Sequence, residues 1–228
     1  MWRLLSGTIP ETLRAELETR IGAATSSHRP GREPETELNS FFAASRGAGA
    51  LLRQLLEQPD ARAVIGQRLN DPVVFHACPT LKQPGAPSTT YRSDAAEWGL
   101  GGDPAALFTL WFAVTEAGAG NGCLRMGSNL GEGERTMVSV SRLSSLELAS
   151  TTAPSYDAAM KAGQVLLFDA SQLYGAYPNH SDRPRIAVRV TLGDRAALKG
   201  REVQEIGDFG SVGLVAKQGW RKLFGGKE

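Results

Sequence analysis

The sequence of 228 residues predicts a mainly β protein with helices in the first third of the chain. The chain contains 26 glycines and 12 prolines, and this content favours many turns over a helical bundle. From Asp71 onward, short apolar segments alternate with turn-forming Gly, Pro and Asn. Helices followed by many short strands predict an antiparallel sandwich or barrel that is buttressed by helices on one face.

Apolar residues at helical spacing predict three helices in the first third of the chain. The expected helices span Glu11–Ala24, Ala50–Glu57 and Ala61–Leu69. Asp60 is a candidate N-cap for the third of them. The segment Ser26–Glu37 is rich in Pro, Arg and Ser, and we expect it to form a loop.

Six short apolar segments predict the strands of the barrel. They are Val73–Phe75, Leu107–Val114, Cys123–Met126, Thr136–Ser141, Gln164–Phe168 and Ile186–Leu192. The glycine-rich stretch Gly118–Gly122 lacks the Gly-Lys-Ser/Thr ending of a phosphate loop, so we expect a turn between strands there.

We expect a single domain over residues 1–228, with a helical part over about 1–70, a barrel over about 71–195 and a tail over 196–228. The tail contains a basic, aromatic segment, Leu214–Phe224. A membrane-surface helix is one interpretation of this segment. We prefer a terminal helix that packs Trp220 and Phe224 on the body of the protein.

Composition excludes several classes of function. The chain has 25 Lys and Arg against 24 Asp and Glu, and this balance gives no overall field that would attract nucleic acid or an anionic membrane. Cys78 and Cys123 are too few for a disulfide scaffold or a four-ligand zinc site, so we interpret them as small apolar residues in a reducing compartment. We therefore expect a cytoplasmic protein without a nucleic-acid or membrane partner.

Two segments carry a more specific signal. The first is NGCLRMGSN at Asn121–Asn129, and the second runs through GQVLLFD at Gly163–Asp169 to YPNHSDRPRIA at Tyr177–Ala187. Together they resemble the phytanoyl-CoA dioxygenase family of Fe(II)/2-oxoglutarate oxygenases. The resemblance covers roughly Pro72–Leu192. It implies a double-stranded β-helix, the cupin-like or jelly-roll barrel, with an active site inside its open mouth.

The resemblance also implies a His-x-Asp…His triad that holds iron on one face, and here the sequence departs from the family. The chain has Arg92, Ser93 and Asp94 where His-x-Asp is expected, and Tyr174 where the distal His is expected. A guanidinium has no lone pair to offer a metal, and a tyrosine binds iron only as the phenolate. Only the carboxylate of Asp94 remains, so we expect a degenerate triad and no bound metal.

Three features leave alternatives open. His76 and His180 could rebuild a metal site with Asp94, although each is also an ordinary histidine. Asp94 to Glu97 reads as a helix capping box, which would explain Asp94 without a function. Arg185 stands where the family binds the distal carboxylate of 2-oxoglutarate through a bidentate contact, but it could also be a structural arginine on a strand.

Three hypotheses for function follow. We prefer a metal-independent, non-oxidative enzyme that acts on a small organic biosynthetic intermediate, free or bound to CoA or a carrier protein. Its catalytic candidates are Tyr174, Asp94 and Arg92, with Arg92 as a fixed positive charge that neutralises Asp94 and binds a substrate carboxylate or enolate. Arg185 would bind a second carboxylate.

The second hypothesis is a non-catalytic partner of an active homologue, in a homo- or hetero-oligomer. The third is an oxygenase that uses Fe(II) and 2-oxoglutarate with atypical ligands.

Overall fold

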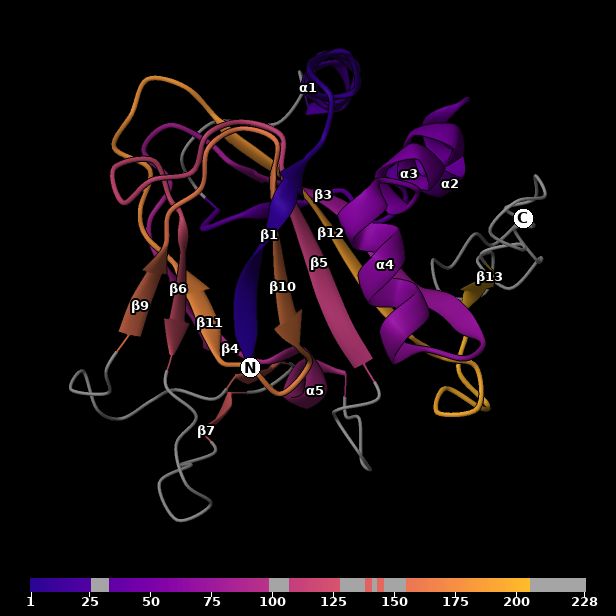
Figure 1. The fold of residues 1–228 in the computed structure, drawn as a ribbon. Coiled ribbons are helices and arrows are strands. Elements are labelled where there is room, and N and C mark those ends of the chain that lie inside the picture. The colour runs from indigo at the N-terminus through magenta and orange to yellow at the C-terminus, as the bar shows by residue number, and fades with distance from the viewer. Residues whose placement is uncertain (26–32, 99–106, 128–137, 141–142, 146–154, 206–228) are drawn as a thin grey trace, which may run out of the picture.

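The computed structural model describes residues 1–25, 33–98, 107–127, 138–140, 143–145 and 155–205. Two antiparallel sheets dominate it (Figure 1). The larger, seven-stranded sheet has the order β1-β10-β5-β12-β3-β13, and β2 pairs with β3 beside this path. Its strands are β1 (Trp2–Thr8), β2 (Thr36–Glu37), β3 (Pro72–Lys82), β5 (Leu107–Ala113), β10 (Gln164–Asp169), β12 (Arg185–Asp194) and β13 (Gln204–Glu205).

The smaller sheet has four strands in the order β4-β11-β6-β9. They are β4 (Thr89–Arg92), β6 (Leu124–Gly127), β9 (Ser155–Ala158) and β11 (Tyr174–Ala176). A separate pair joins β7 (Val138–Val140) to β8 (Leu143–Ser145). In Figure 1 the smaller sheet lies opposite the larger one, as in the jelly-roll arrangement of a double-stranded β-helix.

Helices cover the face of the larger sheet that points away from the smaller sheet (Figure 1). They are α1 (Glu11–Thr25), α2 (Phe41–Ala44), α3 (Ala48–Leu56) and α4 (Pro59–Arg68), while the short α5 (Asp94–Glu97) follows β4. Leucines of α1 and α3 form one buried apolar cluster with Val188 and Val190 of β12. This cluster anchors the helices to the sheet.

A second apolar cluster fills the space between the two sheets. It joins Trp111 and Phe168 of the larger sheet to Met126 and Tyr174 of the smaller one. Because side chains alternate along a strand, β5, β10 and β12 each send one set of residues to the helices and the other into this interior. Two arginines of β12, Arg185 and Arg189, belong to the interior set.

Most of the expected elements are present, with shifted ends. The helices Glu11–Ala24, Ala50–Glu57 and Ala61–Leu69 correspond to α1, α3 and α4, and the strands from Leu107, Cys123, Gln164 and Ile186 correspond to β5, β6, β10 and β12. Val73–Phe75 is the start of a much longer strand, β3. Of Thr136–Ser141, residues 138–140 form β7, and the remainder lies outside the described residues.

Three expectations for the first third were wrong. This part is not wholly helical, because β1 and β2 join the larger sheet. The end of the expected loop Ser26–Glu37 is strand β2. Asp60 is not the N-cap of α4, a position held by Gln58; its carboxylate instead accepts hydrogen bonds from Ser6 Oγ and the Gly7 amide at the end of β1.

Cys78 and Cys123 are free and fully buried, as expected of small apolar residues. Burial raises the pKa of Cys78 to about 12 and that of Cys123 to about 11, so both thiols stay protonated. The expected terminal helix Leu214–Phe224 lies outside the described residues. Within the described part of the chain, none of the helices has the length and apolar content needed to cross a membrane.

Candidate functional site

Two arginines of β12 project into the interior between the sheets. Arg185 and Arg189 share the face of Ala187, whereas Ile186 and Val188 on the other face pack toward the helices. Arg185 is 0% exposed and Arg189 is 2% exposed. A buried guanidinium must be paired and hydrogen-bonded to be tolerated, so the partners of these two side chains define the site.

The three residues predicted to be catalytic come together beside Arg189. Arg92 of β4 and Tyr174 of β11 are direct partners across the smaller sheet, with the Arg92 guanidinium carbon 5.5 Å from the centre of the Tyr174 ring. The Tyr174 hydroxyl donates a hydrogen bond of 2.5 Å to Asp94 Oδ1. Thr109 donates a second one, of 2.6 Å, to Asp94 Oδ2. Both carboxylate oxygens of Asp94 therefore have donors inside the protein.

The cation that faces Asp94 is Arg189, and the expectation that Arg92 neutralises Asp94 was wrong. Arg189 Nη1 lies 3.5 Å from Asp94 Oδ1 and donates a hydrogen bond of 2.8 Å to the Tyr174 hydroxyl. Arg92 is 29% exposed and pairs instead with Glu37 at 2.7 Å and Glu97 at 3.6 Å. The difference follows from depth, because Arg189 enters the interior from the larger sheet while Arg92 lies nearer the solvent.

The capping-box interpretation of Asp94 was also wrong by one position. Ser93 is the N-cap of α5, and its hydroxyl accepts a hydrogen bond of 3.3 Å from the Ala96 amide. Asp94 is the first residue of the helix, and its carboxylate is fully buried in the contacts with Tyr174 and Thr109. Capping of the helix N-terminus therefore does not explain why Asp94 is a carboxylate.

These residues do not fit an Fe(II) ion held by a facial triad. Arg92 offers no lone pair. Burial, together with the adjacent Asp94, raises the pKa of Tyr174 well above its ordinary value, so its oxygen stays protonated. Both oxygens of Asp94 accept hydrogen bonds. Within the described residues, no group of three or more His, Cys, Asp and Glu is placed to hold a metal.

The two histidines considered as replacement ligands lie in different surroundings. His76 is on β3, with Nε2 at 3.0 Å from Asn39 Oδ1 and its ring beside Trp98. Burial lowers the pKa of His76 to about 4. His180 is exposed in the turn after β11, where its amide donates to the Gly120 carbonyl at 2.9 Å.

Two glutamates that the sequence analysis placed in a loop complete the site. Glu35 and Glu37 are two residues apart around strand β2, so both carboxylates point to the same side. Glu37 bridges two arginines, at 2.7 Å from Arg92 and 3.3 Å from Arg189. Burial opposes ionisation, but Arg189 and Arg92 outweigh it and lower the pKa of Glu37 to about 2.

Glu35 is the ion-pair partner of Arg185. Arg185 Nη2 donates to Glu35 Oε1, and Glu35 Oε2 lies 3.9 Å from Arg92. The other donors of Arg185 contact the Gly122 carbonyl and the Thr80 hydroxyl, each at 3.1 Å. The guanidinium carbon lies 5.2 Å from the centre of the Trp111 ring. The alternation of glutamates at positions 35 and 37 was the signal in the sequence that could have identified this pair.

Glu97, expected only as part of a helix cap, is a further residue of the site. It ends α5, 21% exposed, with Arg92 as its ion-pair partner. Burial raises the pKa of Glu97 even though Arg92 opposes the shift. A carboxyl whose pKa is raised, and which lies beside a permanent cation, is a candidate for acid–base chemistry.

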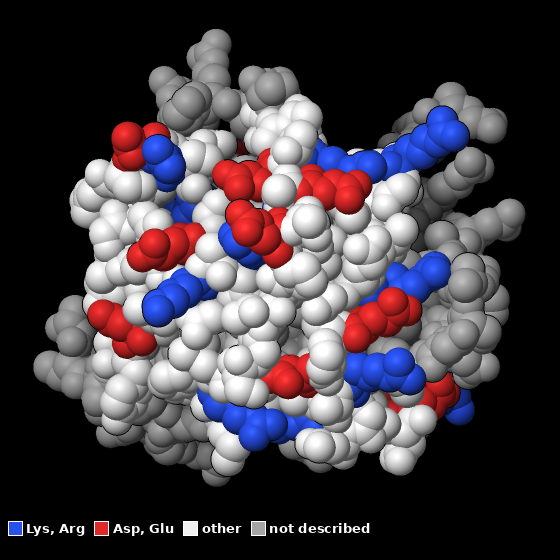
Figure 2. All heavy atoms as spheres, turned by 45° about the horizontal axis from the view of Figure 1, so that its top comes forward, with Lys and Arg blue, Asp and Glu red and all other residues white. Residues whose placement is uncertain are grey.

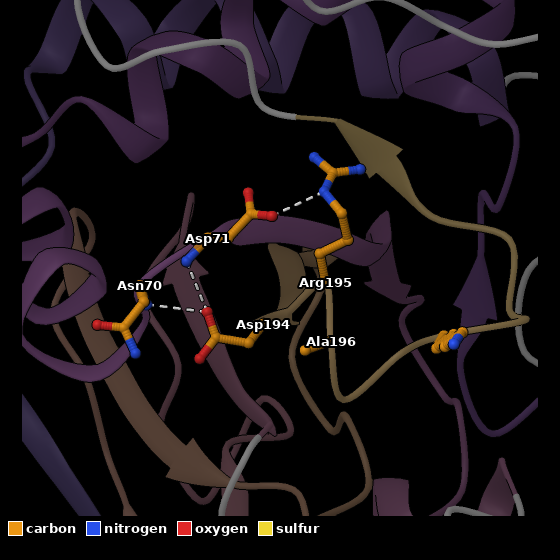
Figure 3. A pocket seen from close by; sticks show the side chains of 6 residues that line it. Asn70, Asp71, Asp194, Arg195 and Ala196 are labelled. Atoms are coloured by element: carbon orange, nitrogen blue, oxygen red, sulfur yellow. Dashed lines mark hydrogen bonds and ion pairs between the residues drawn. The ribbon is translucent and has the colours of Figure 1, made fainter.

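A hollow of about 420 Å³ lies outside this site, at the far ends of β3 and β12 (Figure 3). Asp194 Oδ1 accepts hydrogen bonds from the amides of Asn70 and Asp71, at 2.8 and 2.7 Å. Asp71 in turn pairs with Arg195 at 2.8 Å. These contacts fasten the start of β3 to the end of β12, and none of the site residues named above lines the hollow.

The outer surface carries both charges. On the face drawn in Figure 2, the described Lys and Arg side chains are interspersed with Asp and Glu. This mixture agrees with the formal net charge of +1 for the whole chain.

Comparison with known proteins gives a family match and a set of similar folds. The sequence profile described as phytanoyl-CoA dioxygenase (PhyH) matches residues 5–187. No curated protein sequence matches the chain.

Among solved structures, the epimerase SnoN in complex with Fe3+, alpha ketoglutarate and nogalamycin RO has a TM-score of 0.63 at 15% identity, covering 85% of this chain and 78% of its own. The alpha ketoglutarate dependent carbocyclase SnoK from nogalamycin biosynthesis has a TM-score of 0.63 at 17% identity, covering 90% and 81%. EvdO2 from Micromonospora carbonacea var. aurantiaca, complexed with 2-oxoglutarate, has a TM-score of 0.60 at 16% identity, covering 91% and 89%. At these identities the similarity establishes the fold.

Proposed function

Because the chain belongs to the phytanoyl-CoA dioxygenase family, we propose that it keeps the family's interior site for a small organic substrate but works there without iron. One observation carries this proposal. The positions of the expected iron ligands hold a guanidinium, a neutral phenol and a carboxylate that is already hydrogen-bonded on both oxygens. This set supports binding and acid–base chemistry, and it does not support an iron centre.

Arg92 and Glu97 are the groups that would touch the substrate, because both are partly exposed and form one ion pair. Arg92 would bind a carboxylate or stabilise an enolate, and Glu97 would exchange a proton with it. Tyr174 and Asp94 lie below Arg92, nearly or fully buried. In this proposal the Tyr174 ring holds Arg92 in place, the Tyr174 hydroxyl stays hydrogen-bonded to Asp94, and Arg189 balances the charge of Asp94.

SnoN and SnoK are described as an epimerase and a carbocyclase from nogalamycin biosynthesis. We propose by analogy that the substrate here is also a biosynthetic intermediate, free or attached to CoA or a carrier protein. The reaction would be a non-oxidative one, such as an isomerisation or cyclisation through an enolate.

Metal binding tests the iron-free proposal. The wild-type protein, incubated anaerobically with Fe(II), should retain no stoichiometric iron after desalting and should form no succinate from 2-oxoglutarate. The double variant Arg92→His, Tyr174→His places two imidazoles next to Asp94, so it should gain affinity for Fe(II) or Co(II). Adding Asp94→Asn to that variant should remove the gain. One tightly bound iron per wild-type chain, with succinate formation, would overturn the proposal.

A second candidate, a non-catalytic partner of an active homologue, is favoured by one observation. All three arginines of the site already pair with the chain's own carboxylates. A protein that stabilises a homologue would need no free site. Co-expression with a homologue that has an intact His-x-Asp…His triad would distinguish the two, since only a partner should raise the activity of that homologue.

A further inference from the structure

The guanidinium of Arg185 has no nitrogen left without a partner in the protein, unlike an arginine that waits for a ligand. Each of the three nitrogens of its guanidinium has a partner within the protein: Gly122, Thr80 and Glu35. Glu35 is the only carboxylate among these partners. Its side chain is 9% exposed, so it is held almost completely inside.

The segment that carries Glu35 is fixed on both sides. After Glu35, residues Thr36 and Glu37 pair with β3, and the Leu38 amide donates to the Pro79 carbonyl at 3.0 Å. Before Glu35, the Pro34 carbonyl accepts a hydrogen bond of 2.6 Å from Lys82 Nζ. Backbone contacts thus position the carboxylate independently of its ion pair with Arg185.

Electrostatics favour the same arrangement. Burial opposes the ionisation of Glu35, but Arg185 and Arg92 outweigh it and hold its pKa below the ordinary value. A carboxylate in bulk solvent would have to compete with one that is covalently attached, already oriented and charged. Tethering of this kind gives a high effective concentration, which a free ligand of similar chemistry does not match.

We infer that Glu35 is a built-in ligand of Arg185, and that it excludes free carboxylates such as 2-oxoglutarate from this position. The inference deepens the proposed function, because it leaves Arg92 as the site's contact for a substrate anion. It does not depend on whether a metal binds elsewhere in the chain.

Anion binding to metal-free protein tests this inference, with 2-oxoglutarate and succinate as probes and EDTA present. Calorimetry on the wild-type protein should detect no saturable binding. Glu35→Ala should bind one dicarboxylate per chain, with an affinity on the order of 10-fold or more above any wild-type affinity. The same anions should raise the melting temperature of Glu35→Ala and leave that of the wild type unchanged.

Two controls assign the effect to Arg185. Glu33→Ala removes an exposed carboxylate from the same segment and should bind no anion. The double variant Glu35→Ala, Arg185→Gln should lose the gained binding. If Glu35→Ala does not fold without an anion, then Glu35→Ser, which removes the carboxylate but keeps a small polar group, should show the gain.

Two results would overturn the inference: saturable 2-oxoglutarate binding by the wild type that is lost in Arg185→Gln, or no gained binding in either Glu35 variant. Neither result bears on iron, so a failure here is distinguishable from a failure of the iron-free proposal.

Discussion

Arg189 is a buried cation that needs its carboxylate partners to remain in place. It is 2% exposed and reaches Glu37, Asp94 and the Tyr174 hydroxyl. Transferring such a cation from water is unfavourable, and the surrounding acceptors offset this only while all of them remain. Removing Arg189 or one of these acceptors should therefore destabilise the protein by more than the loss of one hydrogen bond would.

Arg189→Met tests this balance. It should lower the free energy of unfolding by about 3–5 kcal/mol, because Glu37 and Asp94 would lose a buried counter-charge. Arg195→Met is the matched control, since the Arg195–Asp71 pair is 43% and 61% exposed. The control should lose no more than about 1 kcal/mol. Urea denaturation measures both, and equal losses would contradict the argument.

His76 gives a second prediction at the scale of one residue. Its pKa is about 4 in the folded protein against an ordinary value of 6.5, mainly because the ring is buried. Between pH 6.5 and 4 the unfolded chain takes up a proton that the folded chain does not. The free energy of unfolding should thus fall as the pH falls through this window, by at most about 3 kcal/mol from this group.

The variant His76→Gln isolates that effect. Glu97 acts in the opposite sense, because its raised pKa makes the folded state bind the proton more strongly above pH 4.5. Glu37, with a pKa of about 2, loses its contribution only below pH 4.5. Comparing wild type and variant by urea denaturation from pH 4.5 to 6.5 cancels both, and parallel curves would refute the role of His76.

At the scale of elements, the turn before β6 sets the position of Arg185. Gly122 has φ of +94°, and its carbonyl accepts the Arg185 Nε hydrogen bond. A Cβ at Gly122 would overlap Cδ of Lys82, whose ammonium is held by the carbonyls of Pro34 and Pro87. Glycine is needed here both for its conformation and for space.

Gly122→Ala should therefore lower the free energy of unfolding by about 2–4 kcal/mol, through strain and the displacement of Lys82. Gly85 is the matched control. It also has a positive φ, +77°, but a Cβ there meets nothing within 4 Å. Gly85→Ala should lose only about 1–2 kcal/mol, from the backbone alone. Thermal and urea unfolding measure the difference, and equal losses would mean that Lys82 moves freely.

Strand β2 was expected to be a loop, and this error matters because β2 carries Glu37 of the site. It has two residues, too few for a periodic signal, and it follows a Pro-rich stretch. Its conformation comes from pairing with β3, which is distant in sequence. Strands that exist because of such pairing cannot be recognised from local pattern. The longer strands β5, β10 and β12 could be predicted because burial on both faces leaves segments that are mostly apolar.

For the whole molecule, the ion pairs of the site link three parts of the chain. Arg92 comes from the smaller sheet, Arg189 from the larger one, and Glu37 from the segment that leads into the helices. These ion pairs thus connect both sheets and the N-terminal part. The net charge of +1 gives no sign of them, because the paired charges cancel.

Patterns in the sequence were enough to predict the fold class, most of the helices and the long strands. These features depend on local periodicity or on residue identity at a matched motif. How the charges pair is visible only in the folded chain. Glu35 and Arg185 are 150 positions apart, and Glu37 and Arg189 are 152 apart. A buried guanidinium requires a counter-charge, but which carboxylate supplies it depends on where folding brings the chain back to the same point in space.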